Sequence, residues 1–394
     1  MILSDITTIF DCPHSTAPDE GEGYPLIRTP NIGKGRLILD DVHRVCEEVY
    51  NIRNRRAIPQ TNDIIFAREA PAGNAAVITE GQKVCLGQRT VLIRPKPSLV
   101  DAHYLVYFLL APKQQIKLLG YSHGATVGHV NIPDIANLPI ELPLLHEQRK
   151  IASIIENYDN LIEVNNKRIK VLEQIAENLY KEWFVRFRFP GHENAEFENG
   201  IPKGWEYCPV ETLSSVLQRG ISPDYDDDGE LTVISQKCIR QNIMDIKEAR
   251  RQIKVFKPEL NLVDGDTVIC STGTGTLGRV GQVYGDLPNT TFDSHVTLVR
   301  AETLIGKHFL FWTLKEMQPW FMNMGIGSTN QQELYRRTIK NAKVLKADDS
   351  IISRFEEIIE SIHRNIISLM KNQENLIKQR DMLLPRLMSG KLEV

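Results

Sequence analysis

Internal similarity between the two halves of this 394-residue chain is the feature that most limits how it can fold. Short segments of the first half recur in the same order in the second half, which predicts a duplicated structural unit. Two copies favour a pair of similar domains with pseudo-twofold symmetry over an open solenoid, which usually takes about three or more repeats. The matched segments are Leu3–Ile6 with Leu213–Val216, Asn62–Phe66 with Gly265–Ile269, Val91–Arg94 with Thr297–Arg300, His103–Leu105 with His308–Leu310, and Gly124–Thr126 with Gly327–Thr329.

Each half ends in a stretch whose apolar residues recur about every 3.5 positions, which is the seam spacing of a coiled coil. Two amphipathic helices of this length have one obvious partner in each other, so we expect them to pair. Asn165 and Gln373 interrupt the seam, either to fix its register or as partly exposed positions in a loose bundle. Pro385 is expected to stop or kink the second helix. The predicted seam residues are Ile155, Ile162, Asn165, Leu172 and Leu179 in the first helix, and Ile359, Ile366, Gln373, Leu376 and Leu383 in the second.

The segments between the helices have a mixed pattern. Short runs of β-forming residues predict strands at Asp63–Phe66, Thr90–Arg94, Thr267–Ile269 and Val296–Arg300. Helical stretches follow at Tyr104–Leu110 and Phe309–Leu314. The expected fold class is therefore α+β, with two similar mixed α/β globular domains joined by two long helices.

The composition is that of a globular protein, with 42% hydrophobic and 25% charged residues. No apolar run approaches the roughly 18 residues of a membrane-spanning helix, and no secretion signal is visible at the start. The six cysteines form no Cys-x-x-Cys pair, which suits a reducing cytoplasm better than a zinc ribbon or a disulfide scaffold. The net charge of −3 gives no overall nucleic-acid signal, so any positive field must be local or come from a partner.

Two motifs resemble ligand sites but lack the required context. Gly273–Gly278 matches G-x-G-x-x-G, yet a glycine-broken β pattern follows where a dinucleotide site needs a helix, so we expect a loop between two strands. Asp224–Gly229 resembles the start of a calcium-binding loop, but the twelfth position is Ser235, so we expect an exposed acidic turn. The sequence also lacks a P-loop. It predicts no catalytic residues and no metal site.

The chain resembles the specificity subunits of type I restriction-modification enzymes over nearly its whole length. The segments that carry the resemblance are Pro143–Ala152 and Leu179–Phe184 around the first long helix, Ile201–Trp205 at the start of the second domain, and Asn375–Leu392 around the second helix. By this resemblance, residues 1–143 and 189–346 are target-recognition domains. Residues 144–188 and 347–394 are the two conserved spacer helices, which would lie antiparallel.

The resemblance implies a non-catalytic protein that binds double-stranded DNA, each domain reading one half of an asymmetric, bipartite target. The helices would dock two modification subunits, which bind S-adenosylmethionine and methylate adenine N6. Restriction subunits would add cleavage driven by ATP and Mg²⁺. This chain itself would bind no cofactor and have no membrane partner. The alternative is a coiled-coil scaffold without sequence-specific DNA binding, favoured only by the net negative charge.

The DNA-contacting residues are expected on loops, because base edges are read by amide, guanidinium and small polar side chains. Solvated loop polarity is the alternative for each of them. The basic clusters Arg53–Arg56 and Arg336–Lys340 are candidate phosphate contacts or, equally, solvated faces. The base-reading candidates are Arg68, Gln88, Arg89, Thr126 and His129 in the first domain, and Ser271, Thr274, Arg279, His295, Ser328, Thr329, Asn330 and Gln331 in the second.

Overall fold

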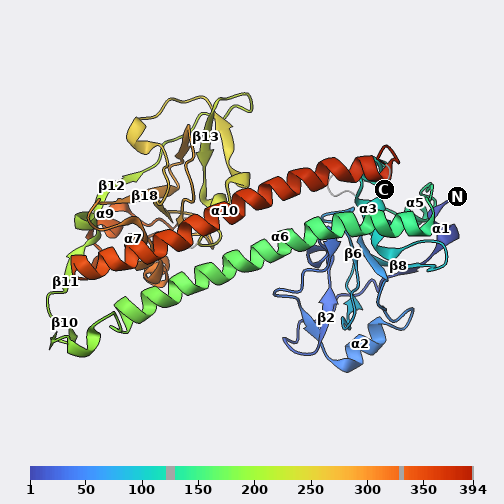
Figure 1. Ribbon diagram of the computed structural model, residues 1–394, viewed down its shortest axis with the longest axis horizontal. Helices are drawn as coiled ribbons and strands as arrows, with labels where there is room; N and C mark the ends of the chain where they lie inside the picture. Colours follow the sequence, from blue (N-terminus) through green and yellow to red (C-terminus); the bar gives the residue numbers. More distant parts are fainter. Residues whose placement is uncertain (121–128, 328–331, 393–394) are drawn as a thin grey trace. The chain divides into compact units, whose positions relative to one another are not determined.

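The computed structural model describes residues 1–120, 129–327 and 332–392, and the chain forms two compact units (Figure 1). The first unit contains residues 1–163 and 373–394, and the second contains residues 164–372. Both divisions fall inside the two long helices, α6 (Leu145–Tyr180) and α10 (Asp349–Met388). Each unit therefore contains one globular part and a portion of both long helices, in agreement with the predicted fold class.

The first unit is built on a five-stranded sheet of order β1-β8-β5-β6-β3 and a three-stranded sheet of order β4-β2-β7. The predicted strands and the helix after them are confirmed. The strands are β1 (Thr7–Asp11), β2 (Tyr24–Ile27), β3 (Gly35–Arg36), β4 (Arg44–Val45), β5 (Ile64–Ala67), β6 (Ala75–Val77), β7 (Cys85–Leu86) and β8 (Thr90–Pro95), and the helices before α6 are α1 (Leu3–Ile6), α2 (Glu47–Arg53), α3 (Ala102–Leu110), α4 (Pro112–Gly120) and α5 (Ile132–Ala136).

The second unit repeats this plan with sheets of order β12-β18-β15-β16 and β14-β13-β17. Two short additional ladders pair β9 with β10 and β11 with β19. The strands are β9 (Phe197–Glu198), β10 (Ile201–Pro202), β11 (Glu206–Pro209), β12 (Ser214–Arg219), β13 (Leu231–Ile234), β14 (Arg250–Gln252), β15 (Thr267–Cys270), β16 (Val280–Gln282), β17 (Thr290–Phe292), β18 (Val296–Ala301) and β19 (Lys343–Lys346), and the helices before α10 are α7 (Lys307–Glu316), α8 (Gln318–Asn323) and α9 (Arg336–Asn341).

A buried ion pair occupies the same place in both units and confirms the internal repeat. Arg94 donates two hydrogen bonds, of 2.8 and 2.7 Å, to the carboxylate of Asp63. Arg300 binds Asp266 in the same bidentate way, at 2.7 Å for both bonds. In each unit the arginine comes from the central strand β8 or β18, and the aspartate precedes the neighbouring strand β5 or β15. The pair therefore fixes the loop before the strand to the middle of the sheet.

One of the predicted matches between the halves is wrong by one helical turn. The carbonyl of Ile6 accepts a bond from Lys96, and the carbonyl of Leu213 accepts the equivalent bond from Glu302. Ile6, not Leu3, is therefore the counterpart of Leu213. Both halves place two buried apolar residues three positions apart here, Leu3 with Ile6 and Val210 with Leu213. The sequence match aligned the second apolar residue of one pair with the first of the other.

The two long helices pack against each other in the core of each unit. In the first unit, Ile151 and Ile155 from the start of α6 share a core with Leu384 and Leu387 from the end of α10. In the second unit, the end of α6 shares a core with the start of α10. The helices therefore run in opposite directions, as the resemblance implied. Helix α10 continues through Pro385 to Met388, so this proline does not stop it.

The residues predicted for the helix seam are all buried or half-buried. Ile155, Asn165, Ile359 and Ile366 are buried, and the other six, Ile162, Leu172, Leu179, Gln373, Leu376 and Leu383, are half-buried. Asn165 is only 5% exposed, so it is not a partly exposed position of a loose bundle. Its amide nitrogen has no hydrogen-bond partner within the described part of the chain, which is a cost in stability.

A buried charged cluster attaches α10 to the globular part of the second unit. His308 Nε2 lies 3.0 Å from Glu360 of α10, and His363 of α10 lies 2.7 Å from Asp264. The ammonium of Lys307 contacts both of these carboxylates. Burial and the neighbouring His363 lower the pKa of His308 to about 4, so its ring is neutral at neutral pH.

We predict that Asp266→Ala destabilises the second unit by about 3 kcal/mol, because it removes the buried carboxylate that binds the half-buried guanidinium of Arg300. All four tryptophans belong to the second unit, so chemical unfolding followed by tryptophan fluorescence reports on that unit alone. Glu196→Ala removes an exposed ion pair with Lys203 and should change stability by less than about 1 kcal/mol. Equal effects of the two substitutions would contradict a structural role for the buried pair.

A second prediction concerns Glu356, whose carboxylate accepts a 2.6 Å hydrogen bond from the backbone N–H of Phe309. Burial raises the pKa of Glu356 to about 7, against the effect of this bond. The folded state thus binds the proton more tightly than the unfolded state, and this carboxyl loses stabilising effect as pH rises through 7. Glu356→Gln keeps the acceptor but does not titrate. Its stability relative to the wild type should increase by roughly 1–3 kcal/mol between about pH 5 and pH 8, and a constant difference would contradict the raised pKa.

Candidate nucleic-acid interface

Three of the predicted residues in the first unit form one connected cluster around the carboxylate of Glu69. Arg68 donates from Nε to the carbonyl of Val130 at 2.9 Å, and its guanidinium lies 2.7 Å from His129 Nε2. His129 Nδ1 lies 2.5 Å from one oxygen of Glu69, and Arg89 Nε lies 3.0 Å from the other. A single carboxylate therefore positions two of the candidate groups, Arg89 and His129.

The side chains of this cluster differ in their exposure to solvent. Arg68 is buried, and its guanidinium supports His129 from behind rather than pointing outward. Gln88 donates its amide to the backbone carbonyl of His14. The side chain of Arg89 is 58% exposed and is the group most available to a ligand. The remaining candidate of this unit, Thr126, lies outside the described residues.

The second unit brings together Thr272 and two of the predicted residues, Ser271 and His295. The hydroxyl of Ser271 is buried and bonded to the hydroxyl of Thr297 at 2.6 Å, so this side chain is not presented at the surface. Thr272 Oγ1 lies 2.6 Å from Nδ1 of the exposed His295. Thr274 is exposed in the loop between β15 and β16. Among these, His295 and Thr274 are available for contact.

The other candidates of the second unit lie near the same loop or outside the described residues. Arg279 is half-buried where the loop rejoins β16, and its carbonyl accepts a 2.9 Å bond from the backbone of Cys270. The candidates outside the described residues are Ser328, Thr329, Asn330 and Gln331.

The two ligand-like motifs behave as the sequence indicated. The Gly273–Gly278 segment closes the antiparallel β15–β16 hairpin, which confirms the loop prediction. Gly273 and Gly275 have φ values of 101° and 76°, which favour glycine. In the acidic turn, Asp226 accepts a 2.9 Å bond from the N–H of Asp228. Within residues 1–120, 129–327 and 332–392, no group of three or more His, Cys, Asp or Glu side chains is placed to hold a metal.

Equivalent backbone hydrogen bonds show that the two clusters occupy the same place in their units. The N–H of Arg68 donates to the carbonyl of Arg89 at 2.9 Å, and the N–H of Ser271 donates to the carbonyl of His295 at 2.8 Å. Arg68 is thus the counterpart of Ser271, and Arg89 is the counterpart of His295. The sequence candidates in the two units are structural equivalents that carry different side chains.

A second repeated backbone bond extends this correspondence. The N–H of Val130 donates to the carbonyl of Arg68 at 3.0 Å, and the N–H of Leu334 donates to the carbonyl of Ser271 at 2.8 Å. The residues immediately before them, His129 and Glu333, therefore hold equivalent positions. A basic group in one unit corresponds to an acidic group in the other.

The ion pairs around these positions differ between the units. Asp11 of β1 and Arg219 of β12 hold equivalent positions, because each lies opposite the same point of its neighbouring strand, β8 or β18. In the first unit Asp11 pairs with Arg68 at 3.4 Å. In the second unit Arg219 pairs with Glu333. One backbone framework thus supports two polar surfaces of different charge pattern.

Comparison with known proteins agrees with this duplicated architecture. A model of the type I restriction modification DNA specificity domain matches residues 2–174, which include the first cluster and most of the first long helix. The type I restriction enzyme MjaVIII specificity subunit of Methanocaldococcus jannaschii is 25% identical over 97% of this chain and 89% of its own length. The MjaIX specificity subunit of the same organism is 26% identical over 84% of this chain and 78% of its own. Residues 2–174 thus match the type I restriction modification DNA specificity domain, and nearly the whole chain is similar to type I restriction enzyme specificity subunits.

A solved structure extends the comparison to the fold of the chain. The type I restriction-modification S subunit from M. genitalium superposes with a TM-score of 0.59 at 15% sequence identity, covering 98% of this chain and 95% of that one. At this identity the likeness concerns the fold. It supports the arrangement of two similar mixed domains connected by long helices.

Acidic residues at the candidate interface were missed by sequence reasoning. Glu69 orients Arg89 and His129, and Asp11 fixes Arg68, yet carboxylates are not sought where a protein meets phosphate groups. The repeat contained a signal for these residues, because equivalent positions in the two halves carry different charges. That signal needs the correct register of β1 and β12, which the sequence match placed wrongly.

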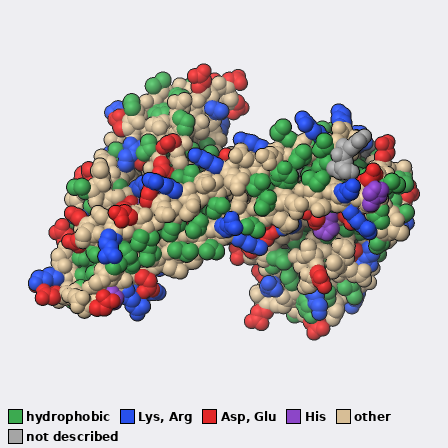
Figure 2. All heavy atoms as spheres, in the orientation of Figure 1, with side chains coloured by type: hydrophobic (Ala, Val, Ile, Leu, Met, Phe, Trp, Pro, Cys, Tyr) green, Lys and Arg blue, Asp and Glu red, His purple; other side chains and the backbone are tan. Residues whose placement is uncertain are grey.

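The two predicted basic clusters have different surroundings. Arg53 is buried and donates to the carbonyls of Leu86 and Ser15, at 2.7 and 2.9 Å, so it supports the fold of its loops. Arg336 and Arg337, in contrast, are exposed. Elsewhere on the face in view, acidic and basic side chains are interspersed (Figure 2). None of the described helices is long and apolar enough to cross a membrane.

Proposed function

We propose that this chain is a type I specificity subunit that reads an asymmetric, bipartite DNA target, one half with each globular domain. The observation that carries the proposal is the pair of equivalent clusters with different side chains. Arg89, His129 and Glu69 in the first unit correspond to His295, Glu333 and Thr272 in the second. Base recognition depends on the donor and acceptor pattern of such side chains, so the two halves of the target should differ.

The match to the DNA specificity domain and the similarity to specificity subunits support the broader part of the proposal, which is DNA recognition within an assembly of several subunits. The finer assignments are that the long helices dock two modification subunits, which hold S-adenosylmethionine and methylate adenine N6, and that restriction subunits add ATP- and Mg²⁺-dependent cleavage. Under this proposal the chain contributes no catalytic residue and no cofactor site of its own. It acts in the cytoplasm, where bacterial and archaeal DNA is found.

The proposal predicts that the complex of this chain with its modification subunits prefers one DNA sequence. Sequencing the methylated positions in DNA from cells that express the complex identifies the target. The complex should then bind a target duplex at least about 1000-fold more tightly than a scrambled duplex of equal length. Equal affinity for both duplexes would contradict sequence reading. Absence of DNA binding at any salt concentration would instead support a scaffold without a nucleic-acid role.

A further prediction separates the two halves of the target. Arg89→Ala should relax the base preference at one or two positions in one half of the target only, and His295→Ala should do so in the other half. Each effect should be about 1–3 kcal/mol at the affected base pair. A library of targets with single-base substitutions measures this through methylation rates.

The matched control for these variants is Lys83→Ala, an exposed residue near Arg89 in the chain that is not part of the cluster. It should leave base preference unchanged in both halves. If Arg89→Ala and His295→Ala altered the same half of the target, the assignment of one half to each domain would be wrong.

A further inference from the structure

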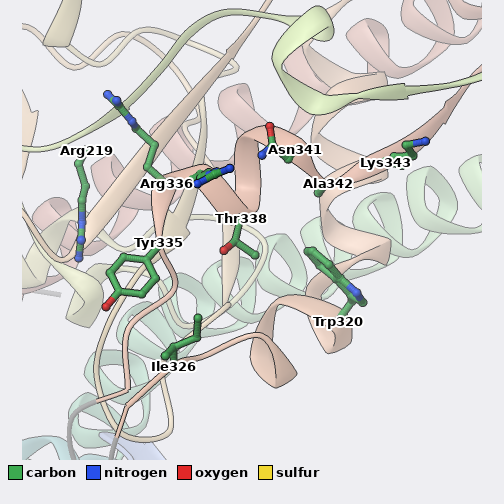
Figure 3. Close-up of a pocket in the computed structure, with 10 residues that line it drawn as sticks. Arg219, Trp320, Ile326, Tyr335, Arg336, Thr338, Asn341, Ala342 and Lys343 are labelled. Carbon is green, nitrogen blue, oxygen red and sulfur yellow. The ribbon is translucent and has the colours of Figure 1, made fainter.

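The second unit has an open depression of about 900 Å³ beside α8 and α9, which the DNA-reading loops do not include. Its apolar surface comes from Trp320, Ile326 and Tyr335, all of which are exposed to solvent. In the view of Figure 3, Thr338 of α9 lies between the rings of Tyr335 and Trp320. Two aromatic rings exposed on a hollow surface indicate a binding site more than a protein interior.

The charged side chains that line this depression are all basic. Its lining includes Arg219, Arg336, Arg337 and Lys343 and no carboxylate, although the whole chain has a net charge of −3. Arg219 is paired with Glu333 behind it. The charged groups of Arg336, Arg337 and Lys343 are exposed and have no hydrogen-bond or ion-pair partner in the described part of the chain. Three uncompensated cations next to aromatic rings favour an anionic ligand with an apolar portion.

The depression is connected to the cluster proposed to read DNA through a chain of three contacts. Glu333, which holds Arg219 at the wall of the depression, also forms an isolated β-bridge with Thr272. Thr272 in turn is hydrogen-bonded to His295, the exposed member of that cluster. A DNA duplex contacted by His295 would therefore have its neighbouring phosphates beside the depression.

We propose that this basic–aromatic pocket (Trp320, Tyr335, Arg336, Arg337 and Lys343) binds the sugar–phosphate backbone of one DNA strand next to the half-site read by the second unit. The inference rests on the proposed function. The guanidinium and ammonium groups neutralise consecutive phosphates, and the deoxyribose rings pack on the aromatic side chains. Phosphate contacts carry no base information. The pocket thus contributes affinity and register, while the neighbouring loops choose the bases.

The test measures salt-dependent affinity of the assembled complex for the target duplex and for a scrambled duplex. Arg336→Ala/Arg337→Ala should reduce the slope of log affinity against log salt by about two, because each lost phosphate contact removes about one released counterion. Affinity should fall for both duplexes by a similar factor, so their ratio changes less than about threefold. Tyr335→Ala should weaken binding of both duplexes without changing the slope, because it removes an uncharged contact.

The matched control is Lys247→Ala/Lys257→Ala, which removes two exposed cations of the same unit that do not line the pocket. Its slope should equal that of the wild type, and tryptophan fluorescence checks that every variant is folded. An unchanged slope for the arginine variant would overturn the pocket assignment while leaving the proposed function intact. A loss of the target-to-scrambled ratio would overturn the backbone role in favour of base reading.

Two more outcomes distinguish a failure of the pocket assignment from a failure of the proposed function. If the arginine variant assembled poorly with the modification subunits but, once assembled, kept the wild-type slope, the pocket would be a protein-docking surface and the proposal would be wrong. If the wild-type complex showed no preference for its target, the proposed function would fail. A reduced slope in the variant would then still support a backbone site in the pocket.

Discussion

The packing of each long helix against the end of the other is the constraint on which the rest of the structure depends. An amphipathic helix of 36 or 40 residues cannot bury its apolar side alone. In the second unit, Phe184 of the helical turn Lys181–Val185, which directly follows α6, packs edge-on against Phe355 of α10, with ring centroids 5.0 Å apart, and against Phe309 of α7 at 4.9 Å. The globular part and both helices therefore complete one hydrophobic core. The first unit combines residues 1–163 with residues 373–394, so the two units cannot be separated by a single cut in the chain.

The repeat separates what holds the domain together from what the domain displays. Asp63 with Arg94 and Asp266 with Arg300 are the same buried pair with nearly the same distances. At the interface, the positions of Asp11 and His129 are taken by residues of opposite character, Arg219 and Glu333. Interior ion pairs resist change because losing one partner leaves a buried charge. The pairs at the interface differ between the units, while the framework pair is the same in both.

Periodicity and the repeat were sufficient to predict the strands, the long helices and the fold class. The register at the start of the repeat was not predictable from the sequence. Each half has two buried apolar residues three positions apart, Leu3 with Ile6 and Val210 with Leu213, so the halves can also be aligned one helical turn out of register. The availability of site residues depends on tertiary neighbours. Arg68 and Ser271 occupy equivalent positions, and each side chain is engaged inside its own unit, by His129 and by Thr297. A residue type predicts what a side chain can bind, whereas only the fold determines whether its polar atoms are still available.

The net negative charge of the chain is compatible with DNA binding because its charges are distributed unequally. Many carboxylates are neutralised locally. Asp159, for example, accepts bonds from Arg380 at 2.8 Å and from Tyr107 at 2.6 Å, and Glu360 is surrounded by Lys307 and His308. A paired carboxylate contributes little field at the distance of a DNA phosphate, since its partner cancels it. Unpaired cations such as Arg336 and Arg337 are not cancelled in this way. Local pairing therefore decides the sign of the field at the DNA-facing surface, and the total charge of the sequence does not reveal it.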